Sequence, residues 1–135
     1  MGTSCDELIE AAGGFKVQPQ KIISGGPMMG FAMFRTDVPI TKTGSCILCL
    51  TKDEVAQYET TACINCGRCV EVCPSNLVPS RLAKCAEHDQ LAQFEKLDGV
   101  ECIECGCCSY VCPAKKHLAQ SIRSMRKTAL ANRKK

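Results

Sequence analysis

Two copies of one cysteine motif constrain this chain more than any other feature of its sequence. The first copy reads Cys63-Ile-Asn-Cys66-Gly-Arg-Cys69-Val-Glu-Val-Cys73-Pro74. The second follows at an offset of 39 residues, reads Cys102-Ile-Glu-Cys105-Gly-Cys-Cys108-Ser-Tyr-Val-Cys112-Pro113, and matches the first at eight of twelve positions. Such a repeat indicates one structural unit used twice. With 13 cysteines, no tryptophan and 4% aromatic residues, cysteine chemistry is expected to replace part of a large apolar core.

Disulfides are a poor explanation for these cysteines. Thirteen is an odd number, and Met1 is not followed by the basic patch and apolar run of a signal peptide. In a reducing compartment, closely spaced cysteines usually bind metal. No apolar stretch approaches the roughly 18 to 20 residues of a membrane helix. The sequence therefore predicts a soluble chain, or one that binds a membrane only from outside, and excludes collagen-like, disordered and membrane-spanning classes.

The spacing C-x2-C-x2-C-x3-C-P is typical of bacterial four-iron ferredoxins. Three thiolates two residues apart lie on a tight turn around one face of a cubane, and the fourth cysteine, followed by proline, binds the other cluster. The sequence thus predicts two [4Fe–4S] clusters. The predicted ligands are Cys63, Cys66, Cys69 and Cys112 for the first cluster, and Cys102, Cys105, Cys108 and Cys73 for the second.

The main alternative for this motif is structural zinc. Zinc ribbons use paired C-x2-C units, but they need neither a third cysteine two residues on nor the C-P ending in both copies. Within the second copy, Cys107 and Cys108 compete for one ligand position. The repeat favours Cys108, because it aligns with Cys69, whereas Cys107 aligns with Arg68.

The remaining chemistry-bearing residues carry weaker signals. Cys46 and Cys49 could form a redox or metal pair, but buried cysteines more often pack as small hydrophobes, and the same applies to Cys5 and Cys85. His88 and His117 are expected to be solvated surface residues. The loop Gly25–Gly30 is rich in glycine but matches no dinucleotide or P-loop motif, so no nucleotide site is predicted in this chain.

Three segments are predicted along the chain. Residues 1–55 read as a small α/β piece: Ser4 and Glu7 fit a capping box, Gly13-Gly14 ends that helix, and Lys21–Ser24 and Val38–Thr43 are extended. Residues 56–114 hold the motifs, with helical stripes at Leu82, Ala83 and Ala86 and, after a cap at Asp89, at Leu91, Phe94 and Leu97. Residues 115–135 form a basic helix with Leu118, Ile122, Met125 and Ala129 at helical spacing. The predicted fold class is α+β.

Charge separates the last segment from the rest. Residues 1–114 carry a net charge of −5, and residues 115–135 carry +8 with no acidic residue. The basic segment is interpreted as a solvated helix end or as a contact with an anionic membrane face or an acidic subunit. Without interleaved aromatic residues, it is a poor nucleic-acid site. If it binds membranes, removal of Arg123, Arg126 and Lys127 should release the protein from anionic vesicles.

Several stretches together resemble a known family. Gly2–Gly14 resembles the helix of a soluble-ligand-binding β-grasp domain. With Ile23-Ser-Gly-Gly-Pro-Met-Met-Gly-Phe31, Asp37-Val-Pro-Ile40 and Cys102–Lys115, the chain is similar to the C subunit of the Rnf (also called Rsx) electron transport complex over nearly its whole length. The resemblance implies a partial β-grasp domain over 1–55, a mostly helical two-cluster ferredoxin domain over 56–114 and a basic tail over 115–135.

The same resemblance implies a function. Complexes of this family move electrons between reduced ferredoxin and NAD, coupled to ion pumping, and the C subunit is peripheral on the cytoplasmic side of the bacterial inner membrane. The domain with the flavin and nicotinamide sites is not in this sequence, so the chain is expected to be a C-terminal portion that acts as an electron relay with no NADH or flavin site. Its expected partners are the other subunits of the complex.

Two other functions fit the motif. The chain could be the iron–sulfur subunit of another oxidoreductase, such as a heterodisulfide reductase or a flavoprotein dehydrogenase, although the glycine-proline loop argues against this. It could also be a non-redox module in which clusters or zinc only stabilise the fold. Reversible reduction of the bound metal distinguishes an electron carrier from a structural metal site.

Overall fold

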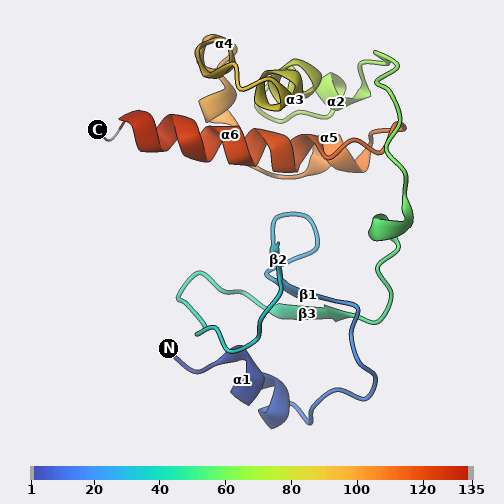
Figure 1. The fold of residues 1–135 in the computed structure, drawn as a ribbon, viewed down its shortest axis with the longest axis vertical. Helices are drawn as coiled ribbons and strands as arrows, with labels where there is room; N and C mark the ends of the chain where they lie inside the picture. The colour runs from blue at the N-terminus through green and yellow to red at the C-terminus, as the bar shows by residue number, and fades with distance from the viewer. Residues whose placement is uncertain (1, 134–135) are drawn as a thin grey trace. The chain divides into compact units, whose positions relative to one another are not determined.

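The computed structural model describes residues 2–133 and divides the chain into two compact units, Met1–Tyr58 and Glu59–Lys135. The first unit contains α1 (Cys5–Ala11), β1 (Lys21–Ser24), β2 (Phe31–Met33), β3 (Ile47–Leu50) and the 3-10 helix η1 (Val55–Gln57). The second contains α2 (Arg68–Glu71), α3 (Pro79–Glu87), α4 (Leu91–Lys96), the 3-10 helix η2 (Gly99–Glu101), α5 (Cys107–Tyr110) and α6 (Leu118–Arg133) (Figure 1). Lys134 and Lys135, the end of the predicted basic segment, lie outside the described residues.

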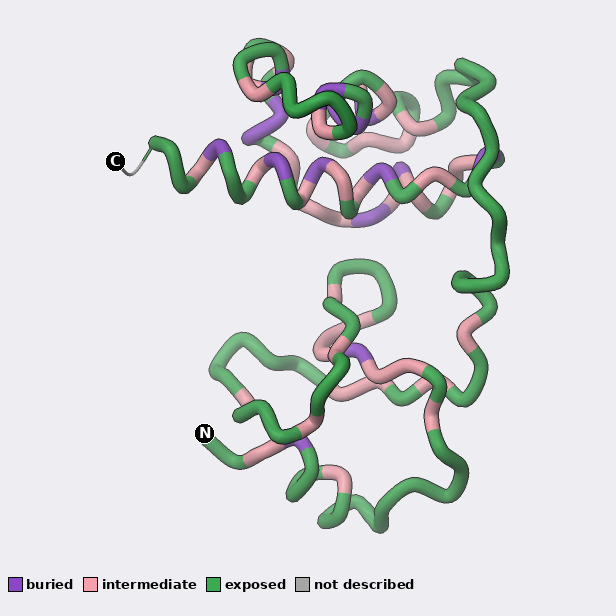
Figure 2. The backbone as a smooth tube through the Cα atoms, in the orientation of Figure 1, coloured by how far each residue is buried: buried purple, intermediate pink, exposed green. Residues whose placement is uncertain are grey.

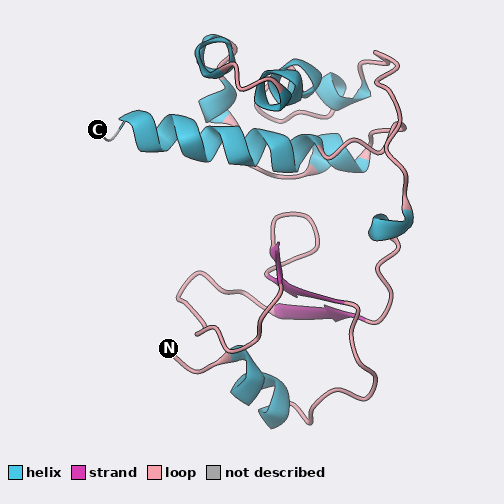
Figure 3. Cartoon of the chain, in the orientation of Figure 1, coloured by secondary structure: helices cyan, strands magenta, loops and turns pink. Residues whose placement is uncertain are grey.

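The first unit is built on a small antiparallel sheet with the strand order β2–β1–β3 (Figure 3). Ile23 of the central strand is buried and lies opposite Ala32 on one side and Leu48 on the other. The predicted strand at Lys21–Ser24 is confirmed. The extended stretch predicted at Val38–Thr43 is wrong as a strand: Pro39 makes an isolated bridge with Ser4, and because proline has no N–H to donate, it interrupts a ladder.

The helix α1 begins as its sequence predicts. The Ser4 hydroxyl accepts from the Glu7 backbone N–H, and the Glu7 carboxylate accepts from the Ser4 backbone N–H, both at 3.2 Å. This reciprocal capping box satisfies two N–H groups that a helix start otherwise leaves unpaired. The helix ends before Gly13 and Gly14, whose φ angles of 100° and 72° lie in the region that favours glycine, as predicted.

The helices of the second unit pack around a core whose largest fully buried side chains are Leu82, Phe94 and Ile122. These residues come from α3, α4 and α6, so the core ties together helices that are far apart in the sequence. In α6 the buried residues are Leu118, Ile122, Met125 and Ala129, which confirms the predicted stripe. Figure 2 shows these buried positions recurring along the helix.

Two local features of this unit were not expected. The cap predicted at Asp89 is wrong: α4 has Gln90 as its N-cap residue, without a side-chain cap. Asp89 has a φ of 52°, a left-handed conformation, whereas a capping residue is normally extended. Further on, Gly99 lies directly against the ring of Phe94, so close that a Cβ at this position would be 2.5 Å from two ring carbons.

Candidate iron–sulfur site

The two cysteine motifs fold into matching backbone loops. Gly67 and Gly106 have φ angles of 78° and 81° and precede the one-turn helices α2 and α5. Asn65 and Glu104, at the same offset of 39 residues, have φ angles of 54° and 59°. The two loops therefore share a backbone conformation at two matching left-handed positions, one before and one after the second cysteine of each motif.

The first motif lines a hollow of about 660 Å³. Its walls include Cys63, Cys66 and Cys69, together with Cys112 from the other motif. Cys63 and Cys66 are exposed, while Cys69 and Cys112 are partly buried. Basic side chains also line this hollow, namely Arg81, Lys84 and Lys116. One carboxylate, Glu87, also lines it and pairs with Lys116 at 3.2 Å, so the walls combine four thiols with an excess of cations, a set that suits a negatively charged cluster.

The second motif lines a much narrower hollow, with about 20 Å³ of free space. Its walls include Cys102, Cys105 and Cys108, together with Cys73 from the first motif. Here Cys108 is buried and the other three are partly buried. The free space is about that of one water. Cys107 is not among the lining residues of this hollow.

The donor chemistry of both hollows fits iron–sulfur clusters. Each cluster is held by four cysteine thiolates, and each hollow offers four cysteines, three from one motif and the fourth from the other. Among residues 2–133, no three histidine, cysteine or acidic side chains are grouped so that they could hold a single metal ion. The thiolates of a cubane bind different irons, so they surround the cluster and do not meet at one point.

Backbone contacts join the two halves of the site. The Thr61 N–H, just before the first motif, donates to the Ala114 carbonyl, just after the second, at 3.0 Å. The Ser109 hydroxyl, next to Cys108, accepts from the Ala119 N–H at 2.8 Å and so supports the first turn of α6. These contacts tie the start of the first motif to the end of the second, and the second motif to the helix that follows it.

Burial raises the pKa values of two thiols that line the second hollow. The pKa of Cys108 is raised to about 11, because a thiolate is less stable away from water. Burial also raises the pKa of Cys102, partly offset by the Glu104 backbone N–H, which donates to Cys102 Sγ at 3.4 Å. A hydrogen bond with Cys105 raises the pKa of Cys107. Without metal, Cys102 and Cys108 are protonated at neutral pH, so metal binding must release their protons.

The cysteines and histidines outside the motifs are not among the residues that line the two hollows. Cys5 and Cys85 are buried and pack as small apolar residues, as expected. Cys46 and Cys49 are exposed, and Cys49 pairs with Ile22 in the sheet. His88 and His117 are both exposed, which fits their expected place at the surface.

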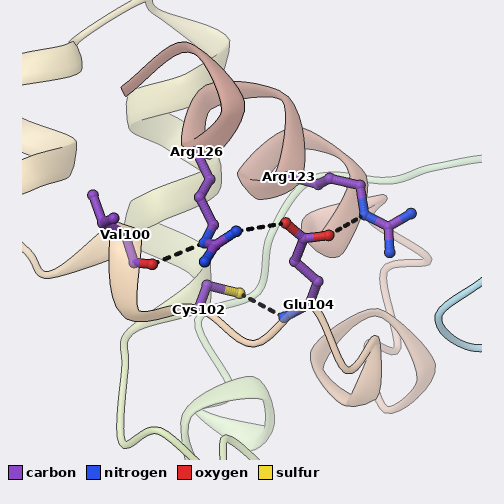
Figure 4. A network of polar contacts seen from close by, with 5 residues as sticks. All are labelled: Val100, Cys102, Glu104, Arg123 and Arg126. Atoms are coloured by element: carbon purple, nitrogen blue, oxygen red, sulfur yellow. Dashed lines mark hydrogen bonds and ion pairs between the residues drawn. The ribbon is translucent and has the colours of Figure 1, made fainter. Parts of the chain in front are cut away.

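One set of contacts beside the second loop was not predicted from the sequence. Glu104 accepts from Arg123 Nε at 2.7 Å and from Arg126 Nη1 at 3.1 Å. Arg126 Nε also donates to the Val100 carbonyl at 2.8 Å (Figure 4). One signal was available, since Glu104 occupies the motif position of Asn65, where a left-handed backbone favours asparagine over glutamate. Its two partners, some twenty residues away in a basic segment, gave no signal.

Comparison with known proteins places the site in a class. Residues 62–116 match a family model described as a 4Fe–4S dicluster domain, which contains both motifs and indicates two [4Fe–4S] clusters as its cofactors. The domain is of the iron–sulfur, ferredoxin-like kind. More specifically, the chain belongs to the family of C subunits of the ion-translocating (Rnf) oxidoreductase complexes.

The relatives that support this assignment come from bacteria and an archaeon. The chain is 45% identical, over all of its 135 residues, to 30% of the C subunit of the Na(+)-translocating ferredoxin:NAD(+) oxidoreductase complex of Acetobacterium woodii. It is 49% identical, over 66% of its length, to 20% of the C subunit of the proton-translocating ferredoxin:NAD(+) oxidoreductase complex of Clostridium ljungdahlii. It is 46% identical, over 90% of its length, to 27% of the C subunit of the ion-translocating oxidoreductase complex of Methanosarcina acetivorans.

The chain spans less than a third of the length of these three relatives. The matches fall in the C-terminal part of the family's proteins. Within residues 2–133, none of the helices combines the length and the apolar character that a membrane span needs.

Proposed function

We propose that this chain is an electron-transfer module with two [4Fe–4S] clusters that works within a membrane-associated, ion-translocating ferredoxin:NAD oxidoreductase complex. The observation that carries the proposal is the composition of the two hollows, each lined by three cysteines of one motif and the fourth cysteine of the other. This exchange is the ligand pattern of two-cluster ferredoxins. The relatives' names supply the complex.

The proposed ligands follow the same pattern. Cys63, Cys66, Cys69 and Cys112 would hold the first cluster, and Cys102, Cys105, Cys108 and Cys73 the second. The placement of Cys108 on the second hollow, and of Cys107 outside its lining, supports the choice between these neighbours. By the same resemblance, we propose that residues 1–55 are part of a β-grasp soluble-ligand-binding domain, that 56–114 form the ferredoxin domain, and that 115–135 are a basic tail.

The residues around each hollow have definable roles in such a module. When bound, [4Fe–4S] clusters accept and release single electrons. The chain fixes their position through eight thiolates and directs backbone N–H groups at sulfur: Leu77 donates to Cys73 Sγ, and Glu104 to Cys102 Sγ, each at 3.4 Å. Hydrogen bonds to cluster sulfurs help to set the reduction potential. The cysteines of the second site are buried or partly buried, whereas Cys63 and Cys66 of the first site are exposed.

The place of the chain in the cell is part of the proposal. As in its family, it would be peripheral, on the cytoplasmic side of the membrane, with the other subunits of the complex as partners. A contact of the basic segment with an anionic membrane face stays a prediction. Two of the residues named for that contact, Arg123 and Arg126, are bound to Glu104 in the structure, so Lys127 is the better residue for testing it.

The first experiment measures iron and acid-labile sulfide per chain after anaerobic purification, with absorption spectra before and after dithionite. About eight iron, about eight sulfide and bleaching on reduction are expected for two redox-active cubanes. Zinc in place of iron, or iron that cannot be reduced, would refute the electron-transfer proposal.

A second experiment tests the exchanged ligands. Cys73→Ser is expected to lower iron by about half or more, because it removes a ligand of the second cluster while lying in the first motif. Cys107→Ser is the matched control, since this thiol is adjacent to a ligand but outside the lining of the hollow. Full iron in Cys73→Ser, or iron loss in Cys107→Ser equal to that in Cys108→Ser, would refute the assignment.

A further inference from the structure

Glu104 lies at an unfavourable point of the second ligand loop, between the proposed ligands Cys102 and Cys105. Its φ is 59°, and a side chain other than glycine or asparagine in this left-handed region costs roughly 1 kcal/mol. The matching position of the first loop is Asn65, a residue type that tolerates this conformation. The glutamate therefore needs a compensating interaction, which its carboxylate finds outside the loop.

That interaction comes from α6. Arg123 and Arg126, three residues apart on one face of the helix, hold the two oxygens of the Glu104 carboxylate at 2.7 and 3.1 Å. Arg126 in addition binds the Val100 carbonyl at 2.8 Å. Figure 4 shows the result: Arg126 bridges Val100 and Glu104, two residues before and two residues after Cys102. The loop is thus fixed on both sides of a ligand.

The pairs are partly shielded from water, since the three side chains are 20–29% exposed. Ion pairs at this depth are screened less than surface pairs. The first loop shows a different arrangement, because the Asn65 side chain contacts Cys63 of its own loop, at 3.7 Å between Oδ1 and Sγ. The two loops match in backbone but differ in what supports them.

We propose that Arg123 and Arg126 are positioning residues that act through Glu104 to hold the second ligand loop and to raise the reduction potential at that site. This inference rests on the proposed electron-transfer function and adds its regulation by two residues of the basic segment. Two effects contribute. Glu104, Arg123 and Arg126 together carry a net charge of +1, which favours the addition of an electron to the cluster. Their ion pairs also keep the Glu104 N–H directed at Cys102 Sγ, and this hydrogen bond favours the reduced state of the cluster.

The test is a redox titration of the loaded protein followed by electron paramagnetic resonance. The signal that is lost in Cys108→Ser is assigned to the second site. Arg126→Gln removes a cation and is expected to move the potential of that signal to more negative values. Glu104→Gln removes an anion but keeps a side-chain oxygen that can accept from Arg126, so the change in charge decides the sign and the potential is expected to move to more positive values. The potential of the first site is expected to move less in both variants.

Arg133→Gln provides the matched control. Arg133 lies on the same helix and pairs with Glu95 at 3.3 Å, but its side chain is 56% exposed and contacts neither ligand loop through this pair. Its removal is expected to leave both potentials unchanged. Shifts in the same direction for Arg126→Gln and Glu104→Gln, equal shifts at both sites, or a shift in Arg133→Gln equal to that in Arg126→Gln would overturn the proposal.

Two further measurements keep the proposal testable if Arg126→Gln loses its iron. Arg126→Lys keeps the charge but cannot bind Glu104 and the Val100 carbonyl through two separate nitrogens, so its second-site potential should stay closer to the native value than that of Glu104→Gln. Its backbone amides over 99–105 should exchange with solvent faster than in the native protein. Unchanged exchange would contradict the positioning role. Failure of the function itself looks different, because the native protein would then show no reducible signal.

Discussion

A substitution of Gly99 tests how closely the second unit is packed around Phe94. Gly99 begins η2, which leads directly into Cys102, and it lies against Phe94, whose side chain is fully buried. In Gly99→Ala the new Cβ would lie 2.5 Å from Cε1 and Cζ of the ring, closer than carbon atoms can approach. The ring is enclosed and cannot move away freely, so either the ring or η2 must shift. Overpacking of this kind costs about 1–3 kcal/mol.

The assay is the rate at which the loaded protein loses its cluster absorbance in guanidinium, because metal loss makes equilibrium unfolding irreversible. If the whole cost falls on the unfolding rate, the rate rises about 5- to 160-fold. Gly26→Ala is the control, since a Cβ there meets no atom within 4 Å.

A second variant checks the mechanism. Phe94→Leu shortens the ring side chain and costs less than the roughly 3–5 kcal/mol of a Phe→Ala change. Combined with Gly99→Ala, it should relieve the clash, so the double variant should unfold more slowly than the sum of the two costs predicts. A native unfolding rate in Gly99→Ala, or strictly additive costs in the double variant, would refute the packing argument.

Three further outcomes are expected. Ser4→Ala removes the capping hydroxyl and should destabilise the first unit by about 1 kcal/mol, seen as faster hydrogen exchange in α1. Lys21 lowers the pKa of Asp53 through a hydrogen bond at 2.8 Å, so this pair stabilises the first unit at pH values above the unfolded pKa of Asp53. That stability is lost as the pH falls through the lower folded pKa. In an acid titration followed by circular dichroism, Asp53→Asn should abolish this loss. Cys85→Ser buries a hydroxyl in the core and should speed the loss of cluster absorbance in guanidinium with the initial iron content unchanged, whereas Cys46→Ser, at an exposed position, should change neither.

Predictions from the sequence were correct where the local sequence alone decides the structure. The buried stripe from Leu118 to Ala129 follows from helical spacing alone, and the capping box of Ser4 and Glu7 depends only on residues within one helical turn. The stretch around Pro39 failed because extended propensity says nothing about whether a neighbouring strand is available, and a proline cannot complete the ladder. Asp89 failed because its residue type suits both a cap and a left-handed turn, and the packing of α3 against α4 decides between them.

At the candidate site, the repeat predicted more than single residues could. The offset of 39 residues fixed which cysteine of each motif corresponds to which, and the hollows contain the sets expected from it. The ion pairs of Glu104 could not be predicted, because they join residues about twenty positions apart whose proximity depends on how α6 lies over the loop. Charge alone had suggested an outward role for Arg123 and Arg126, whereas tertiary packing directs both toward Glu104.

The shared walls of the two hollows have a consequence for how the protein is made. During synthesis, the first hollow has three of its cysteines once Cys69 has left the ribosome, but its fourth cysteine, Cys112, emerges only after nearly the whole second motif. The four cysteines of the second hollow are all present only when Cys108 has followed Cys73 and Cys102. Under the proposed ligand assignment, a chain that ends before residue 108 therefore has four cysteines for neither cluster, and loading is expected only after both motifs are available.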